Sequence, residues 1–454
     1  MSVLPGFLTV PHTSRFALTR GRTPKALVSH LPEFDNAIDR SVFPPDDDLV
    51  CADFLIDGGN LVGVGLPGTF DGEIALLELD ESIVLPAFTE LHTHLDKGHI
   101  WPRQSNPDGT FAGALEATNK DRVANWSEQD VRARMEFGLS TAYAHGTRTI
   151  RTHLDSLDPQ HKISWPLFAE IREEWADRMT LQGAALAGVD RLIDDDVFKD
   201  LMDTILPHGG IPGAATYMIP ELQNVLTKMF RAAMDAGVDL DFHVDETLDA
   251  DAKTLLVIAQ TAIDLGFEGQ ITCGHCCSLS RQSPSDIDRA LDLVARSGIT
   301  VVSLPMCNMY LQNRNEPGSP PHTPRFRGVT LLHEMKARGI PVAISSDNTR
   351  DPFYAYGDLD ALEVYREATR IAHLDHPIVD WINTITQTPA KTMGLKGGFD
   401  IDAPADLVLT RARSFSELLS RPQGDRVVIR NGKAIERVLP DYRTLDHLFT
   451  SRES

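Results

Sequence analysis

The sequence is poor in cysteine and has no long apolar run. Five cysteines occur in 454 residues, an odd number without regular spacing, which argues against a disulfide framework and favours a reducing cytosol. No run of eighteen apolar residues occurs, and SVLPGFLTVPHTSRF after Met1 lacks both a basic start and a long apolar segment. We therefore expect a cytoplasmic protein without a membrane span or a signal peptide.

Positive charge is also scarce. The chain has 43 lysines and arginines against 65 aspartates and glutamates, a formal net charge of −22. This excess repels nucleic-acid backbones and anionic membrane surfaces, so neither is an expected partner; solubility is the simpler account of the acidity. No glycine-rich phosphate loop follows the first predicted strand, which argues against an open dinucleotide-binding sheet.

What is present is a regular alternation of short β-rich runs and amphipathic helical segments. The segments 127–146, 221–237 and 251–266 have helical spacing, and the last two end on glycine, a common helix stop. Eight repeats of strand and helix predict an α/β fold, a parallel (β/α)8 TIM barrel. The predicted strands are 82–94, 147–155, 179–188, 213–220, 239–246, 270–277, 299–305 and 340–348.

The two ends of the chain have a different pattern, with short strand-like runs and glycine turns. Residues 24–85 and 395–445 are expected to pair into one small β-sandwich around a barrel at 86–394, and residues 1–23 receive no assignment. The dipeptide Asn431-Gly432 is a strong signal for a hairpin turn.

Chemistry-bearing residues gather where the predicted strands end. His92 and His94 alternate on one strand and would project from the same face, as two imidazoles that chelate a metal do. Two unrelated surface histidines would give the same spacing, so the interpretation needs partners elsewhere. The active sites of such barrels lie at the carboxyl ends of the strands. The partners expected there are His243, Glu246, His275 and Asp347.

Structural interpretations of the same residues stay open. Asp347 stands in a stretch rich in turn formers, and Glu246 stands just before a predicted helix. Cys273-x-x-Cys276 has no second cysteine pair to complete a zinc ribbon, so these thiols are expected to be packing residues.

Several segments together resemble a known family. PAFTELHTHLDK, HVDE, GHCCSL, LPMCNMYLQNR and SSDNTRDPFYAYGDLDAL, in this order between Val50 and Val438, are similar to the amidohydrolase superfamily. More narrowly, they resemble its cytosine deaminase branch and the neighbouring aminotriazine hydrolases of the N-isopropylammelide amidohydrolase type. The resemblance implies the barrel and the terminal sandwich, and relatives of this barrel are commonly homo-oligomers.

The resemblance also implies roles for individual residues. Glu246 and His275 match the acid/base and water-positioning groups, and Asp347 matches a group that is both ligand and base. No lysine follows GAATYM, so one divalent ion is expected, and zinc or iron(II) suits these ligands. The implied metal ligands are His92, His94, His243 and Asp347.

The expected substrate is a small heterocycle. The resemblance implies a hydrolytic deaminase of cytosine or a similar amino-heterocycle, which attacks with metal-activated water and releases ammonia. The glutamine that reads cytosine in that branch is replaced near Gly188 or Val189, so hydrolysis of an N-substituted aminotriazine or a cyclic amide is the alternative. The candidate substrate-binding residues are Lys97, Gln182, Asn348 and Phe353.

Overall fold

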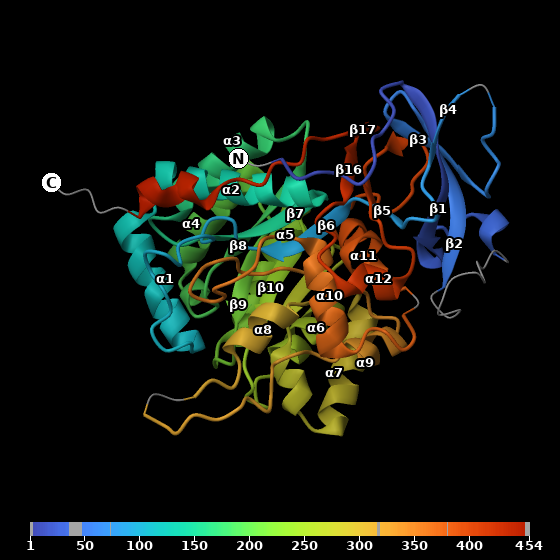
Figure 1. The fold of residues 1–454 in the computed structure, drawn as a ribbon. Helices are drawn as coiled ribbons and strands as arrows, with labels where there is room; N and C mark the ends of the chain where they lie inside the picture. Colours follow the sequence, from blue (N-terminus) through green and yellow to red (C-terminus); the bar gives the residue numbers. More distant parts are fainter. Residues whose placement is uncertain (1–2, 36–47, 73, 316–317, 379, 450–454) are drawn as a thin grey trace. The chain divides into compact units, whose positions relative to one another are not determined.

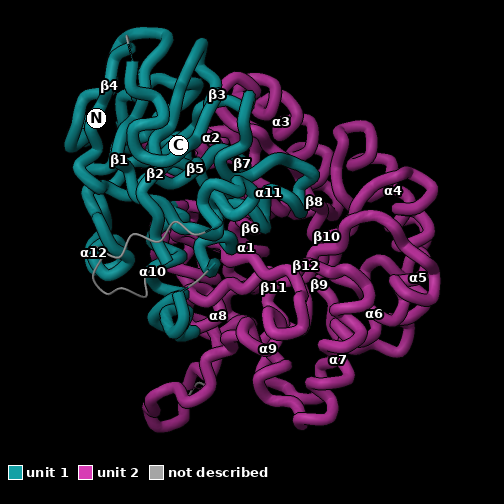
Figure 2. The backbone as a smooth tube through the Cα atoms, turned by 90° about the vertical axis from the view of Figure 1, so that its right-hand side faces the viewer, with its two compact units in different colours: residues 1–89, 140–149, 360–441 teal, residues 90–139, 150–359, 442–454 magenta. Residues whose placement is uncertain are grey.

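The computed structural model describes residues 3–35, 48–72, 74–315, 318–378 and 380–449. Figure 1 labels the helices and strands along the chain, and Figure 2 colours the two compact units into which the chain divides. Unit 1 comprises residues 1–89, 140–149 and 360–441, and unit 2 comprises residues 90–139, 150–359 and 442–454. No helix within the described ranges is long and apolar enough to cross a bilayer.

All eight strands predicted for the alternating region are present. Parallel pairing runs through β13-β12-β11-β10-β9, and β6, β7 and β8 follow one another in a second sheet. Isolated parallel bridges join Ala184 to Ile211 beside β9, and Thr93 to Asp347 beyond β13. The strands are β6 (Phe88–Thr93), β7 (Thr147–Asp155), β8 (Thr180–Leu186), β9 (Gly213–Thr216), β10 (Leu240–Val244), β11 (Ile271–His275), β12 (Thr300–Ser303) and β13 (Val342–Ile344).

The helices between these strands begin and end where local chemistry predicts. Helices α5 and α6 both end at a glycine in the left-handed conformation, Gly237 and Gly266, as their C-terminal glycines predicted. Ser283 caps α7 by accepting from the Asp286 amide. The helices are α1 (Phe111–Asn125), α2 (Glu128–His145), α3 (His161–Glu174), α4 (Asp195–Ile205), α5 (Leu222–Ala236), α6 (Thr254–Leu265), α7 (Pro284–Ser297), α8 (Pro305–Leu311) and α9 (Leu332–Ala337).

Unit 1 is built from both chain ends and contains, in its described residues, sheets ordered β14-β3-β2-β1-β4 and β17-β16-β15-β5. The predicted hairpin is confirmed, since Asn431 and Gly432 both have positive φ between antiparallel β16 and β17. The strands are β1 (Arg15–Pro24), β2 (Leu49–Asp57), β3 (Asn60–Gly65), β4 (Ala75–Glu78), β5 (Val84–Pro86), β14 (Ala403–Pro404), β15 (Leu407–Leu409), β16 (Val427–Arg430) and β17 (Lys433–Ala434).

The boundaries differ from those expected from the sequence. Most of β1 falls within residues 1–23, which the sequence left unassigned, and it pairs with β2. The predicted strand 82–94 is two strands, because β5 pairs with β15 while β6 pairs with β7. Residues 360–394 belong to unit 1. The helices of unit 1 are α10 (Ala361–Ala372), α11 (Gln387–Thr392) and α12 (Phe415–Ser420).

Candidate active site

The two histidines of β6 face one carboxylate. His92 lies within the strand and His94 follows its end, and both are buried. Their Nε2 atoms lie 3.6 and 3.2 Å from Oδ1 of Asp347. The strand alternation that predicted a common direction is therefore confirmed.

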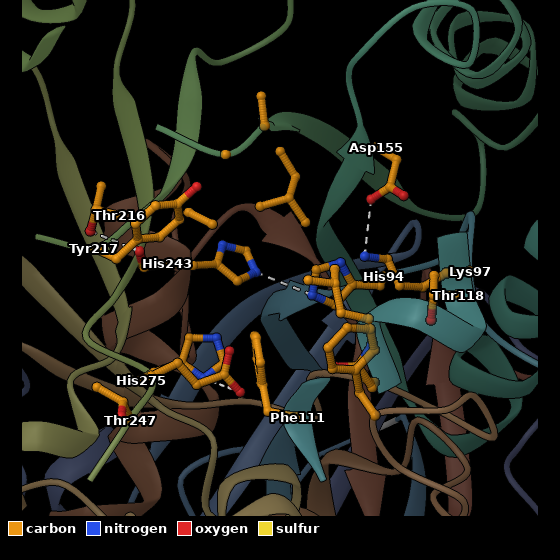
Figure 3. Close-up of a pocket in the computed structure, with 18 of the residues that line it drawn as sticks. His94, Lys97, Phe111, Thr118, Asp155, Thr216, Tyr217, His243, Thr247 and His275 are labelled. Carbon is orange, nitrogen blue, oxygen red and sulfur yellow. Dashed lines mark hydrogen bonds and ion pairs between the residues drawn. The ribbon is translucent and has the colours of Figure 1, made fainter. Parts of the chain in front are cut away.

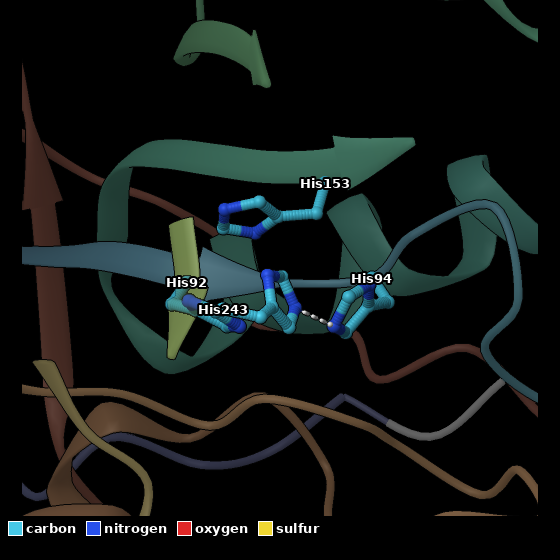
Figure 4. A group of neighbouring side chains, drawn as sticks. All are labelled: His92, His94, His153 and His243. Atoms are coloured by element: carbon cyan, nitrogen blue, oxygen red, sulfur yellow. Dashed lines mark hydrogen bonds between the residues drawn. The ribbon is translucent and has the colours of Figure 1, made fainter. Parts of the chain in front are cut away.

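A third histidine comes from β10. His243 Nε2 lies 3.2 Å from His94 Nε2, and the His243 ring centroid lies 4.4 Å from that of His92. Burial first, and neighbouring histidines second, lower the pKa of His92 and His243, and burial followed by the charge of Lys97 lowers the pKa of His94. They are therefore neutral near pH 7 and offer lone pairs. Figure 4 shows the three rings, with the contact between His243 and His94 as a dashed line.

Asp347 is fully buried without a side-chain hydrogen-bond partner in the described part of the chain. Burial raises its pKa to about 7. An unpaired buried carboxylate is costly unless a cation neutralises it. The unpartnered Asp347 oxygens, together with three neutral imidazoles, fit one divalent ion such as zinc or iron(II).

His275 is the last residue of β11 and lies beside His92 and His243. Its Nδ1 accepts from Nδ2 of Asn308 at 2.9 Å, so the imidazole hydrogen resides on Nε2. That Nε2 is buried and has no hydrogen-bond partner among the described side chains. Burial lowers the pKa of His275 to about 3, and the ring is therefore a neutral donor.

Glu246 follows β10 and lies beside His275. Its Oε1 is 3.4 Å from His275 Nδ1 and accepts from Asn308 Nδ2 at 3.3 Å. Burial, and then the charge of Asp347, raise the pKa of Glu246 well above its ordinary value. The raised pKa favours the protonated form of Glu246, which is the form that a general acid needs.

These groups face one cavity of about 670 Å³ (Figure 3). His94, His243, His275, Glu246 and Asp347 all line it. The other walls are largely apolar and aromatic, with Phe111 and Leu115 of α1 among the lining residues. A concave apolar cavity with a few convergent polar groups is typical of small-molecule sites.

Three of the four candidate substrate-binding residues line this cavity: Lys97, Asn348 and Phe353. Gln182 does not. It is the third residue of β8, away from the strand end, and its Oε1 accepts two hydrogen bonds from Arg151. Its side chain is thus committed elsewhere, and the cavity wall at this strand is formed by Leu186, Ala187 and Gly188.

Lys97 belongs to a chain of paired charges along one wall. Its Nζ lies 3.0 Å from Asp155 Oδ1, and Arg122 Nη1 donates to Asp155 Oδ2 at 3.1 Å. Burial alone would lower the pKa of Lys97, but the charges of Asp155 and Asp96 reverse the effect and raise it. Lys97 therefore stays charged, and it lines the same cavity as Glu246 and Asp347.

Sequence reasoning missed several of these residues. His153 and Asp155 end β7 just as His92 and His243 end theirs, so the strand-end signal was available. Asn308 lies in LPMCNMYLQNR, a segment already noted for its resemblance. Arg122 lies on α1, a helix without a clear apolar stripe, and had no comparable signal.

Strand-end histidines beside two carboxyls of raised pKa are typical of metal-dependent hydrolases. The chain belongs to the amidohydrolase family, whose profile matches residues 172–436. It is 50% identical over 442 residues to a pterin deaminase of Rhizobium rhizogenes, covering 97% of this chain and 98% of the relative.

More distant relatives belong to the branch expected from the sequence. The N-isopropylammelide isopropyl amidohydrolase of a Pseudomonas species is 22% identical over 387 residues, 82% of this chain and 89% of the relative. The structure of 5-methylcytosine deaminase from Klebsiella pneumoniae superposes with a TM-score of 0.78 at 21% identity, covering 92% and 97% of the two chains. The predicted superfamily and branch are thereby confirmed.

Proposed function

We propose that this chain is a metal-dependent hydrolytic deaminase of a fused-ring amino-heterocycle, with pterin as the leading substrate. The observation that carries the proposal is the position of Glu246 and Asp347, two buried carboxyls of raised pKa, on the same cavity as His94, His243 and His275. The 50% identical relative, a pterin deaminase aligned over nearly its whole length, supports the choice of ring.

The cavity favours a substrate larger than cytosine. Its volume of about 670 Å³ lies within the range for drug-sized ligands, and a single pyrimidine ring would leave much of it to water. Phe111 and Phe353, whose centroids are 5.5 Å apart, present apolar surface to a planar ring system. A bicyclic pteridine uses this space better than one ring does.

The residues of the site can carry the proton transfers that deamination needs. A divalent ion held there supplies the Lewis acidity that makes water a nucleophile near neutral pH. Asp347 takes a proton from the attacking water while the Nε2 hydrogen of His275 orients it. Glu246 gives its proton to the ring nitrogen beside the amino-bearing carbon. The proton taken by Asp347 then passes to the amino group, the carbon–nitrogen bond breaks, and ammonia leaves, while the hydroxyl proton of the new carbonyl group returns to Glu246 and restores its acid form.

We further infer that β6 to β13 close into a (β/α)8 barrel and that the two sheets of unit 1 form a sandwich. Isolated bridges connect the two sheets at both of their edges, and this supports the barrel. Ala184 of β8 bridges to Ile211 just before β9, and Thr93 of β6 bridges to Asp347 just after β13. The carboxyl ends of its strands would then converge on one mouth, where the histidines and carboxyls are found.

The test is ammonia release by protein loaded with zinc or iron(II). We expect kcat/KM for pterin to exceed that for cytosine by at least about tenfold, because contacts to the second ring are lost with the smaller substrate. An alkylamine from N-isopropylammelide, with no ammonia from pterin, would favour the alternative hydrolase. No product from the whole panel with metal bound would refute the deaminase proposal.

A further inference from the structure

His153 lies against the histidine cluster but has no part in the proton transfers proposed above. It is fully buried on β7, and its ring centroid is 4.0 Å from that of His92 and 4.7 Å from that of His243. One nitrogen from each of His92, His94, His153 and His243 lies within 4.8 Å of the others. Two nitrogens that bind one zinc ion lie at most about 4.2 Å apart, and about 3.4 Å apart in a tetrahedral site, so the longest of these separations would have to shorten when the ion binds.

The far side of the His153 ring is held by a buried ionic network. His153 Nε2 lies 2.8 Å from Asp241 Oδ1, and Arg151 Nη1 donates to Asp241 Oδ2 at 3.0 Å. Arg151 is held in turn by Gln182 and Thr272. A carboxylate paired with a guanidinium is an acceptor, so the hydrogen of His153 resides on Nε2.

This tautomer leaves Nδ1 of His153 as a bare acceptor. Nδ1 is buried and has no hydrogen-bond partner within the described ranges, and Figure 4 shows the ring turned toward the other three imidazoles. Histidines that bind metals almost always give their other N–H to a carboxylate or carbonyl group, which fixes the ring and raises its basicity. His92 and His94 face Asp347, a carboxylate of the expected ligand set, whereas His153 pairs with Asp241, which is not an expected ligand.

We propose that His153 is a further nitrogen ligand of the metal centre, bound through Nδ1 and fixed by Asp241. The inference rests on the metal dependence in the proposed function. It extends the expected ligand set by one imidazole and assigns the Gln182–Arg151–Asp241 network to the support of that ligand. A buried imidazole N–H needs an acceptor in any role, so Asp241 alone does not distinguish a ligand from a packing residue, whereas the bare Nδ1 turned toward the other imidazoles does.

The direct test is a crystal structure of the zinc-loaded wild-type protein. We expect the Nδ1–zinc distance to be about 2.0–2.1 Å. A bound zinc ion with His153 Nδ1 more than about 3 Å away would overturn the inference and leave the proposed function standing. A wild-type protein that binds neither zinc nor iron(II) would overturn both.

Substitutions give a second measurement that does not depend on turnover. His153→Phe keeps an aromatic ring against His92 and removes the nitrogen. Its zinc Kd, from competition with a chelator, should rise by at least about tenfold, as should that of Asp241→Asn. The matched control is His99→Phe, because His99 is also buried, has no ring hydrogen bond in the described part of the chain, and packs on Phe137.

The control should bind zinc with the wild-type Kd. The cobalt(II) absorption spectrum should change in His153→Phe and stay unchanged in His99→Phe, since it reports ligand number and geometry. A His153→Phe protein with the wild-type zinc Kd and an unchanged cobalt spectrum would refute the assignment. If His153→Phe fails to fold, the His153 Nδ1–zinc distance in the wild-type crystal structure still tests the assignment.

Discussion

Asp347 in unit 2 and Asp360 in unit 1 are both buried aspartates, yet their surroundings are opposite. Asp360 accepts from Arg426 through both oxygens, at 2.8 and 2.6 Å, and from the Leu362 amide. Asp347 has no lysine or arginine partner among the described residues, and its Oδ1 instead lies 3.2 and 3.6 Å from Nε2 of the neutral His94 and His92. Burial alone would raise both pKa values, but Arg426 and His145 lower that of Asp360 below its ordinary range, whereas that of Asp347 rises to about 7.

The difference distinguishes Asp360, a carboxylate that stabilises the fold through Arg426, from Asp347, a carboxylate that is available to bind a ligand. Both aspartates are buried, so burial does not identify function. A buried polar group without a partner is rare because it costs free energy, and it persists where the cost serves a site. The expected consequence is that substitutions at the unpaired groups remove activity, and substitutions at the paired groups remove stability.

The largest effect is expected at Glu246. Glu246→Gln keeps the shape but cannot give and take a proton, so kcat should fall by about 10²–10⁴. Glu246 is not an expected ligand, so zinc content and Tm should stay at wild-type values. Steady-state kinetics with elemental analysis checks both, and near wild-type turnover with full metal would eliminate Glu246 as the acid.

Asp347→Asn should affect metal binding without the same cost in stability. The amide is neutral and easier to bury than the unpaired carboxylate, so the metal-free variant should unfold at or above the wild-type denaturant concentration. Zinc affinity should fall because the charged ligand is lost. Metal-free unfolding curves and chelator competition measure the two effects. Strong destabilisation of the metal-free variant would show that Asp347 stabilises the fold as Asp360 does, and would contradict the prediction.

Asp360→Asn should have the opposite result. Breaking a buried ion pair leaves Arg426 without its partner and costs about 3–5 kcal/mol of unfolding free energy. Turnover per folded molecule should stay at the wild-type value. Urea unfolding at neutral pH, together with kcat normalised to folded protein, tests this. A stable variant with poor turnover would place Asp360 among the functional groups.

The same pair gives a pH dependence with a definite sign. The pKa of Asp360 is lowered in the folded state, so its contribution is fully present above the unfolded value of about 3.9 and is lost as pH falls below it. The stability difference between wild type and Asp360→Asn should therefore shrink between about pH 4 and pH 2. A difference that is constant over this range would show that the Arg426 pair does not depend on the Asp360 charge.

The strand-end groups were predictable from the sequence because strand alternation and barrel geometry are local rules. His92, His94, His243, Glu246, His275 and Asp347 were all named from their positions at strand ends, and the structure brings them together. The failure at Gln182 has the same origin, since the third residue of β8 is far from the strand end. The assignment of His153 as a ligand, the metal identity and the oligomeric state stay predictions.

Other features depend on contacts between distant segments, which no short stretch encodes. The Arg426–Asp360 pair joins residues 66 positions apart, and the wall made by Arg122 and Asp155 joins α1 to the end of β7. The boundary between the units was missed for the same reason, because β5 and β6 form one continuous apolar run that serves two sheets.

Arg122 shares one property with each aspartate. It forms an ion pair, with Asp155, as Asp360 does with Arg426, and it lines the cavity, as Asp347 does. Its side chain is 26% exposed, so the ion pair with Asp155 contributes at most about 1 kcal/mol. Arg122→Leu keeps the apolar stem, and Lys97 continues to hold Asp155. We expect kcat within about threefold of wild type and KM for pterin raised by about tenfold, because the variant loses a contact that substrate and transition state share. Arg122→Lys is the control that restores charge alone. A fall in kcat at constant KM would instead place Arg122 in the transition-state contacts.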